Sequence, residues 1–202
     1  MFRTRIRRPV TAWLGALLAL QISGFAHPAA AQSAARAATP LAAANARAVR
    51  RELSRAEAQL RVLVQGRAQP YTVIIREPQR LIQRIPAALL FVPDSATLRE
   101  DAMDEGLGAV AKVMHQRRRL VAQIAVYTDD IGGANTNVTF SAQRAAAIVT
   151  ALQAAKIGSD RLSAVGAGAA ASLASNDAPE GRTQNRRVEI AFGLSLAALS
   201  AP

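Results

Sequence analysis

The sequence predicts an α/β sandwich fold, in which a single mixed sheet carries two helices on one face. Three observations lead to this prediction. Four short apolar runs between residues 87 and 192 have the length and composition of β-strands. Two longer segments between them repeat apolar residues every three or four positions, which is typical of helices packed on a sheet. The last run alternates polar and apolar residues, so the predicted order is β-α-β-α-β-β.

Residues 1–31 have the features of a signal peptide. Four arginines within the first eight residues precede an apolar run, Val10–Ile22, that is short for a membrane span. Ala29–Ala31 fits the small-residue rule for cleavage, which would make Gln32 the first residue of the mature chain. An uncleaved membrane anchor is the alternative, and cleavage is favoured because a polar, alanine-rich stretch follows.

The segment 32–86 is predicted to contain a linker, an arginine-rich helix and a short strand. Gln32–Ala48 has a linker composition of Ala, Ser, Pro and Arg, whereas Leu41–Val64 has apolar residues at helical spacing opposite a row of arginines. Tyr71–Arg76 is rich in β-formers, and two prolines are expected to interrupt the chain after it. Three interpretations of this helix are possible: it packs on the domain, it pairs with a second copy in a homodimer, or it lies on an anionic membrane. Packing on the domain is favoured because the apolar stripe is narrow and lacks aromatic residues.

Residues 87–193 are predicted to form the domain, and residues 194–202 a C-terminal tail. The expected elements, in order, are a strand at Ala87–Val92, a helix at Thr97–His115, a strand at Leu120–Tyr127, a helix at Ser141–Ile157 capped by Gly158, a strand at Leu162–Gly166, a loop at Ala167–Glu180 and a strand at Arg186–Phe192. Acidic residues crowd the start of the first helix and arginines its end. This arrangement complements the helix dipole and needs no functional explanation.

Two opposite charges are predicted on one rim of this fold. Asp129 follows a buried strand, and Arg144 lies in the first turn of the next predicted helix, with Ser141 as its N-cap. A capping box favours Glu or Gln at that position, and the positive end of the helix disfavours a cation. An anion bound to the helix N-terminus and to Arg144 would resolve this conflict, and Asp129 could meet an ammonium group of the same ligand. The residues leave two interpretations open, a zwitterion site or an ion pair between Asp129 and Arg144.

Several motifs between Ala87 and Phe192 resemble the OmpA-like peptidoglycan-binding domain of the OmpA, MotB and Pal type. The motifs are Thr128-Asp129 with Gly132, Asn137 with Ser141 and Arg144-Ala145, Gly166-x-Gly168, and Asn185-Arg186-Arg187-Val188-Glu189. Asp129 and Arg144 are 144 − 129 = 15 positions apart, as in that family.

The resemblance implies a site for the diaminopimelate of the peptidoglycan stem peptide. Its residues would be Asp94, Thr128, Asp129, Asn137, Arg144 and Arg186. In this family the paired Asp and Arg, here Asp129 and Arg144, hold the amino-acid end of diaminopimelate, and Arg186 would close the site. The sequence departs from the family pattern at Val126-Tyr127, where Gly-His is usual, and at Phe140, where Leu is usual. It departs also at Phe91-Val92-Pro93, where a Phe-Asp-Phe opening is usual, and after Gly168, where an alanine-rich segment lacks the usual proline.

These features predict a non-catalytic, periplasmic protein that binds peptidoglycan in an envelope of the Gram-negative type, with partners among outer-membrane or other envelope proteins. A hydrolase is disfavoured. After signal cleavage His115 is the only histidine, the chain has no cysteine, and no metal-ligand cluster, cofactor motif or Ser/His/Asp set is recognisable. The net charge of +11 comes from scattered cations without aromatic stacking residues, so nucleic-acid binding is not expected. The alternative function is a basic interaction protein whose arginine-rich helix binds anionic lipid or a partner.

Overall fold

The computed structural model describes residues 28–65 and 71–199, with side chains from Ala42 onward. The predicted signal peptide therefore lies outside the described residues, apart from its last four, which are helical. The chain divides into two units, residues 1–40 and 41–202. The first unit is described only over residues 28–40, which belong to helix α1 (Pro28–Leu63). The second unit holds the sheet.

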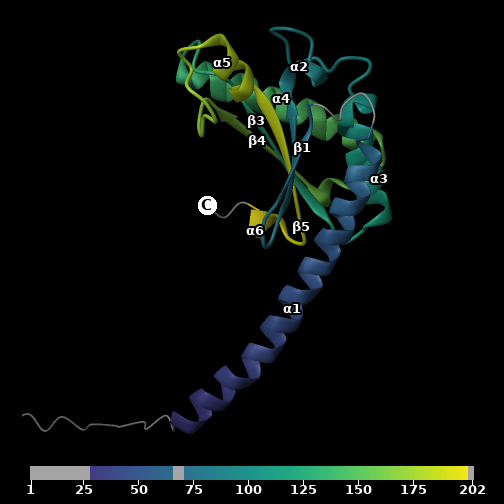
Figure 1. Ribbon diagram of the computed structural model, residues 1–202, viewed down its shortest axis with the longest axis vertical. Coiled ribbons are helices and arrows are strands. Elements are labelled where there is room, and N and C mark those ends of the chain that lie inside the picture. Colours follow the sequence, from purple (N-terminus) through teal and green to yellow (C-terminus); the bar gives the residue numbers. More distant parts are fainter. Residues whose placement is uncertain (1–27, 66–70, 200–202) are drawn as a thin grey trace, which may run out of the picture. The chain divides into compact units, whose positions relative to one another are not determined.

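Five strands form one mixed sheet in the order β1-β2-β5-β3-β4 (Figure 1). Their bounds are β1 Val73–Arg76, β2 Leu81–Pro86, β3 Val121–Tyr127, β4 Leu162–Gly168 and β5 Arg187–Gly193. Strands β3 and β4 are parallel, and the other neighbouring pairs are antiparallel. Ile190 of β5 lies opposite Ile124 of β3 on one side and Gln83 of β2 on the other. The predicted class, a single mixed sheet with helices, is confirmed.

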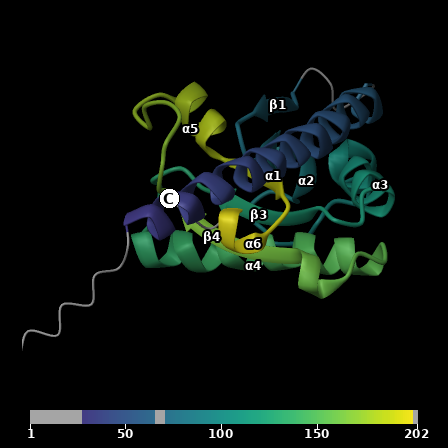
Figure 2. The same ribbon diagram turned by 90° about the horizontal axis from the view of Figure 1, so that it is seen from below.

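The main core lies on one face of this sheet. Helices α1, α3 (Gly108–Gln116) and α4 (Ala134–Ala154) contribute to it, so α1 joins the two helices that were expected. Successive side chains of a strand point to opposite faces, and every second residue of β3, from Ala122 to Val126, is fully buried in this core. Helix α4 runs beside β4 at one edge of the sheet (Figure 2). The opposite face carries a small cluster with the short helix α6 (Leu196–Leu199).

Helix α1 is longer than predicted. Gln32–Ala48, expected as a linker, is helical, because alanine has the highest helix propensity and Pro28 occupies a first-turn position where proline is tolerated. Further along the helix, Leu53, Ala56 and Leu60 are fully buried in the main core. The apolar stripe of this part of α1 therefore packs on the domain and is not exposed for a membrane.

The first strand of the domain was predicted in the wrong place. Ala87–Val92 contains the short helix α2 (Ala87–Leu90), followed by an isolated bridge between Phe91 and Leu98. The strand is β2, directly before α2. Two prolines, Pro78 and Pro86, had suggested an interruption there, but Pro86 takes the last position of the strand. A run of four apolar residues such as α2 does not by itself distinguish helix from strand.

Helix α4 begins seven positions before the predicted start at Ser141. Its N-cap is Gly133, with extended backbone angles, and no side chain caps it. Residues 135–139 are Asn, Thr and Val, which have modest helix propensity, and packing of this turn on the sheet overrides that preference. Gly158 was expected as the C-cap, but the helix ends at Ala154 with Ala155 as its C-cap, and Lys156 takes the left-handed conformation, with φ +66°.

The helix predicted at Thr97–His115 also begins later. Residues before Met103 form turns, a π-helical turn spans Met103–Leu107, and α3 follows. The predicted loop after β4 ends in an additional helix, α5 (Pro179–Asn185). A 3-10 turn at Ser159–Arg161 precedes β4. Within residues 28–65 and 71–199, no helix has both the length and the hydropathy that crossing a membrane requires.

Candidate functional site

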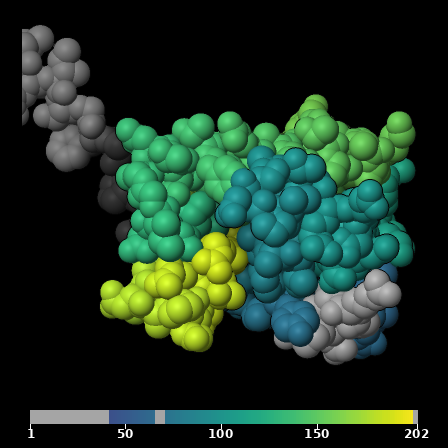
Figure 3. All heavy atoms as spheres, turned by 90° about the horizontal axis from the view of Figure 1, so that it is seen from above, coloured from purple at the N-terminus to yellow at the C-terminus, as the bar shows by residue number. Residues whose placement is uncertain are grey.

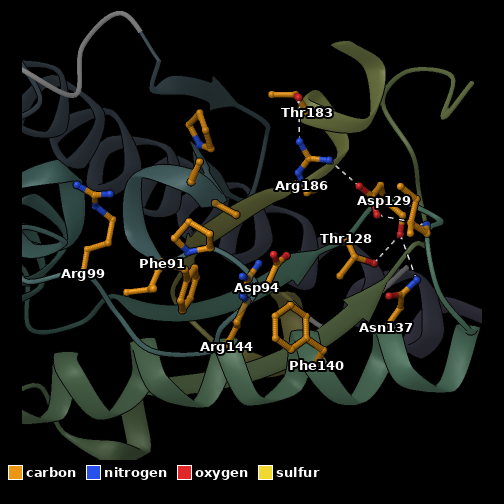
Figure 4. A pocket seen from close by; sticks show the side chains of 16 residues that line it. Phe91, Asp94, Arg99, Thr128, Asp129, Asn137, Phe140, Arg144, Thr183 and Arg186 are labelled. Atoms are coloured by element: carbon orange, nitrogen blue, oxygen red, sulfur yellow. Dashed lines mark hydrogen bonds and ion pairs between the residues drawn. The ribbon is translucent and has the colours of Figure 1, made fainter. Parts of the chain in front are cut away.

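A cavity of about 500 Å³ opens where β3 ends, between the turn after α2, the start of α4 and the end of α5. In Figure 3 these teal, green and yellow segments meet on one face of the molecule. All six residues predicted for the site line this cavity. They are Asp94, Thr128, Asp129, Asn137, Arg144 and Arg186. Figure 4 shows Asp129 and Arg186 at one side, Arg144 beside Asp94 in the middle, and Arg99 at the other side.

Asp129 is fixed by hydrogen bonds to its side chain and to its backbone. Its side chain is buried, with one carboxylate oxygen accepting from the Ile131 N–H at 3.3 Å and the other from Arg186 at 2.6 Å. The Thr128 hydroxyl and the Asn137 amide both donate to the Asp129 carbonyl, at 2.8 and 3.2 Å. Thr128 and Asn137 therefore set the position of the backbone that carries the carboxylate.

Arg186 reaches Asp129 from the end of α5, across the opening of the cavity. A second guanidinium nitrogen of Arg186 donates to the Thr183 hydroxyl at 2.9 Å. The Arg186 side chain is 43% exposed, whereas that of Asp129 is 11% exposed. The ion pair thus joins a fixed, buried anion to a cation that remains accessible to solvent.

Arg144 is buried without a carboxylate partner. Its Nε donates to the Ser95 carbonyl at 2.8 Å, and its guanidinium lies 4.8 Å from the centre of the Phe91 ring and 4.2 Å from that of Phe140. Among the described residues Arg144 forms no ion pair. Burial lowers the pKa of Arg144, the negative charge of Asp94 partly offsets this, and the positive charge of Arg186 adds to the lowering.

The turn after α2 brings the Ser95 carbonyl into hydrogen-bond contact with Arg144 and places the Asp94 carboxylate near it without forming an ion pair. Asp94 has φ +50°, in the left-handed region that aspartate tolerates better than most residues. The Ser95 hydroxyl donates to the Thr97 hydroxyl and accepts from the Thr97 N–H, both at 2.9 Å. This turn directs the Ser95 carbonyl towards the Arg144 side chain.

Helix α4 holds the other half of the cavity against β4. Asn137, Ser141 and Arg144 are spaced by four and three residues, so they lie on one face of the helix, and all three are buried. The Ser141 hydroxyl accepts from the Gly168 N–H at 2.9 Å and donates to the Val138 carbonyl. At Gly166 a Cβ would lie 2.4 Å from the Ala142 backbone nitrogen, so the close approach of α4 to β4 requires glycine there.

Two expectations about this site are wrong. Ser141 is not an N-cap and Arg144 is not in the first turn, because α4 begins at Ala134. Arg144 is therefore not an unfavourable cation at a helix N-terminus. Its distinguishing feature is a buried guanidinium that forms no ion pair with the described residues. The alternative of an ion pair between Asp129 and Arg144 is also not formed, because Asp129 pairs with Arg186.

Two cavity residues, Arg99 and Thr183, were not anticipated from the sequence. Thr183 lies three positions before Arg186 on α5, in a segment for which no helix or strand had been predicted. Arg99 pairs with Asp101 two positions away and carries no sequence signal that separates it from other surface arginines. To predict either residue as part of the cavity, one would have needed to know the path of the chain around it.

Val126 and Tyr127, which depart from the family pattern, do not line the cavity. Val126 is fully buried in the main core. The Tyr127 ring lies 3.7 Å from the Arg187 guanidinium, and Arg187 donates to Glu189 at 2.8 Å. Of the departures, Phe140 and the stretch Phe91-Val92-Pro93 line the cavity.

Comparison with known proteins assigns the domain. The family model described as "OmpA family" matches residues 90–186, the segment that includes the six predicted site residues. Residues 90–186 form an OmpA-family domain. The predicted resemblance is thereby confirmed.

Relatives of this OmpA-family domain occur in longer proteins. The probable lipoprotein YiaD of Escherichia coli (strain K12) is 34% identical over 134 residues, covering 66% of this chain and 59% of that protein. The peptidoglycan-binding protein ArfA of Mycobacterium tuberculosis is 45% identical over 64 residues, covering 32% and 20%. The chain thus spans less than two thirds of either relative.

A solved structure supports the same fold. The periplasmic domain of Helicobacter pylori MotB aligns with a TM-score of 0.58 and 26% identity, over 68% of this chain and 87% of that one.

His115, the histidine that was considered for a hydrolase, does not line the cavity. Its ring contacts the Ala155 carbonyl at 2.7 Å, and this contact gives it a structural role. Nowhere in the described part of the OmpA-family domain and its flanks are three His, Cys, Asp or Glu side chains grouped to hold a metal ion.

Proposed function

We propose that this protein is a non-catalytic, peptidoglycan-binding component of the cell envelope. In this proposal the cavity holds the amino-acid end of diaminopimelate in the stem peptide. The ligand carboxylate contacts the Arg144 guanidinium, and the ligand ammonium contacts the Asp129 carboxylate. Asp94, Thr128 and Asn137 shape the pocket around them. Arg186 moves between Asp129 and the ligand, closing the site.

The observation that carries the proposal is the state of Arg144. A buried guanidinium without a carboxylate is unfavourable unless another anion compensates it, and a planar guanidinium can bind a carboxylate through two hydrogen bonds. The cavity contains three arginines and two aspartates, a balance of 3 − 2 = +1. A ligand that brings a carboxylate to Arg144 and an ammonium to Asp129 matches both charges at once.

The relatives support the cell wall as the ligand source. ArfA is described as a peptidoglycan-binding protein, and the matched MotB structure is a periplasmic domain. For this chain we accordingly propose a periplasmic location at the cell wall. Partners would be outer-membrane or other envelope proteins, and α1 provides a helix that can pair with a second copy.

Sedimentation with isolated sacculi tests this function. Residues 32–202 are expected to pellet with sacculi, and Asp129→Asn and Arg144→Met are each expected to weaken binding at least tenfold, about 1.4 kcal/mol. Asp130→Asn and Arg119→Met alter exposed residues of the same types and are expected to bind like the parent protein. Parent-like sedimentation of both site variants would refute the assigned residues.

The second candidate, a basic interaction protein, has one supporting observation. Arg47, Arg50, Arg51 and Arg55 are exposed on α1 and form no ion pair among the described residues. Their charge would favour adsorption to anionic lipid, although the apolar stripe of α1 is occupied by the core. Binding to anionic vesicles that falls steeply with added salt and is unchanged in Asp129→Asn would favour this candidate.

A further inference from the structure

A second hollow, of about 430 Å³, lies on the exposed side of α4 next to the cavity. It is lined by Asn135, Thr136, Thr139, Phe140 and Gln143. Phe140 lines both the hollow and the cavity, so the two are neighbours that share this side chain. Residues 136, 140 and 143 are spaced by four and three positions and therefore share one face of the helix.

The lining of this hollow is polar but uncharged. Its two amide and two hydroxyl side chains are exposed, and within the described part of the chain they form no side-chain hydrogen bond. Amides and hydroxyls both donate and accept hydrogen bonds. The cavity on the other side of Phe140 carries five charged side chains, so the two sites differ in the ligand chemistry that they favour.

We propose that the hollow binds a sugar of the glycan strand, the amino sugar to which the stem peptide is attached. This inference rests on the proposed function, since it places a second part of the same ligand. The hydroxyl and N-acetyl groups of such a sugar require neutral donors and acceptors, which the four polar side chains supply. The Phe140 ring offers an apolar surface for the C–H groups of the sugar ring.

The distance between the two sites suits this assignment. Gln143 lies one position before Arg144 on α4, and Thr136 one before Asn137, so these two hollow residues are each adjacent in sequence to a cavity residue. Three extended peptide residues span at most about 10 Å, and one helical turn rises about 5.4 Å. A short stretch of stem peptide can therefore connect a diaminopimelate in the cavity to a sugar in the hollow by passing Phe140.

Calorimetric titration with three ligands tests the inference. The ligands are a stem tripeptide that ends in diaminopimelate, the same tripeptide attached to its amino sugar, and a stem peptide lengthened at its C-terminus without a sugar. For the parent protein we expect the sugar to strengthen binding about tenfold, as two additional hydrogen bonds would do. The double variant Thr136→Ala/Gln143→Ala should lose this gain and keep the parent affinity for the free tripeptide.

The matched control is Thr150→Ala/Gln153→Ala, which removes the same groups from exposed positions further along α4 and should retain the gain. Equal affinity of the parent for the free and the sugar-bearing tripeptide would overturn the inference and leave the proposed function intact. A gain from the lengthened peptide alone would assign the hollow to peptide, which also overturns it. Failure of all three ligands to bind would overturn the proposed function, and the inference with it.

Discussion

At the scale of single residues, Arg144 is held in position by contacts from three residues, and we expect its charge to matter less for stability than for the binding proposed above. Its Nε is fixed by the Ser95 carbonyl, and two aromatic rings flank its guanidinium. Cation–π contacts of this kind contribute about 0.5 to 2 kcal/mol, while removing a guanidinium from water opposes folding. These two effects oppose each other, so we do not expect the charge itself to add to the stability of the fold.

Replacement of Arg144 by methionine should separate the two roles. Methionine fills much of the same volume between Phe91 and Phe140 without a charge to desolvate. We expect the free energy of unfolding of Arg144→Met to stay within about 1 kcal/mol of the parent value, measured by urea denaturation, while sacculus binding is lost. A loss of several kcal/mol would mean that the guanidinium supports the fold itself.

The tyrosine stacked on Arg187 should titrate above its ordinary range. Burial raises the pKa of Tyr127, the negative charge of Glu189 raises it further, and Arg187 acts in the opposite direction. Because the folded state then holds the phenol proton more tightly than the unfolded state, this stability is present below about pH 10 and is lost as the pH rises through the folded pKa.

The measurement is urea unfolding between about pH 9 and 11 for the parent and for Tyr127→Phe, whose stability should fall less over this range. Tyr71→Phe is the control, because Tyr71 is 59% exposed. If the free energy of unfolding fell equally with pH in the parent and in Tyr127→Phe, burial of Tyr127 would not perturb the pKa of its phenol.

The charge partners of the site could not be read from the sequence. Asp129 and Arg186 are separated by 57 positions, and each has other residues of opposite charge closer in the chain. The motif identified both as site residues, but their pairing depends on α5, which brings Arg186 across the cavity. Motif spacing thus predicted which residues line the site and not which of them contact each other.

At the scale of elements, α4 shows why the site was predicted more accurately than its local geometry. Its first two turns contain residues of modest helix propensity, so propensity alone delayed the predicted start to Ser141. The strands β3, β4 and β5 were predicted correctly because their apolar runs are long and bounded by turn residues. β2 was missed because Pro78 before the strand and Pro86 at its end suggested an interruption.

The contact of α4 with β4 should be highly sensitive to one methyl group. Gly166→Ala would place a Cβ against the backbone of Ala142, which cannot move without shifting the helix. We expect a loss of about 1 to 3 kcal/mol or more in the free energy of unfolding, together with weaker ligand binding, because Asn137 and Arg144 move with α4.

Gly133→Ala is the matched comparison, since a Cβ there would lie 3.7 Å from the Thr136 hydroxyl, an ordinary contact. Chemical denaturation of both variants measures the difference. Equal stability of the two would contradict the close approach between α4 and β4.

At the scale of the whole molecule, the part of α1 from Ala42 onward belongs to the same core as the OmpA-family domain. Leu53, Ala56 and Leu60 are buried with residues of β2, β3 and β5. This part of α1 lies before the matched family segment, yet it covers apolar surface of the sheet. We therefore expect the helix and the domain to unfold in one cooperative transition.

Truncation of Leu60 tests this cooperativity. Leu60→Ala should lower the free energy of unfolding by about 2 to 5 kcal/mol, because it leaves a cavity in the core. Val62→Ala, at a position that is 64% exposed, should change it by less than about 0.5 kcal/mol. Circular dichroism and amide hydrogen exchange in the strands should report the same shift, whereas a loss confined to α1 would show that the helix unfolds separately.

The cavity draws its lining from Pro86 to Arg186, so it exists only when nearly the whole domain is folded. Any ligand of this cavity therefore binds the folded chain and not the unfolded one. At a local ligand concentration a hundredfold above the dissociation constant, such binding adds about 2.7 kcal/mol to stability by mass action. Under the proposed function, a cell wall that presents the ligand at high density would protect the bound protein from proteases, and the released protein would be degraded faster.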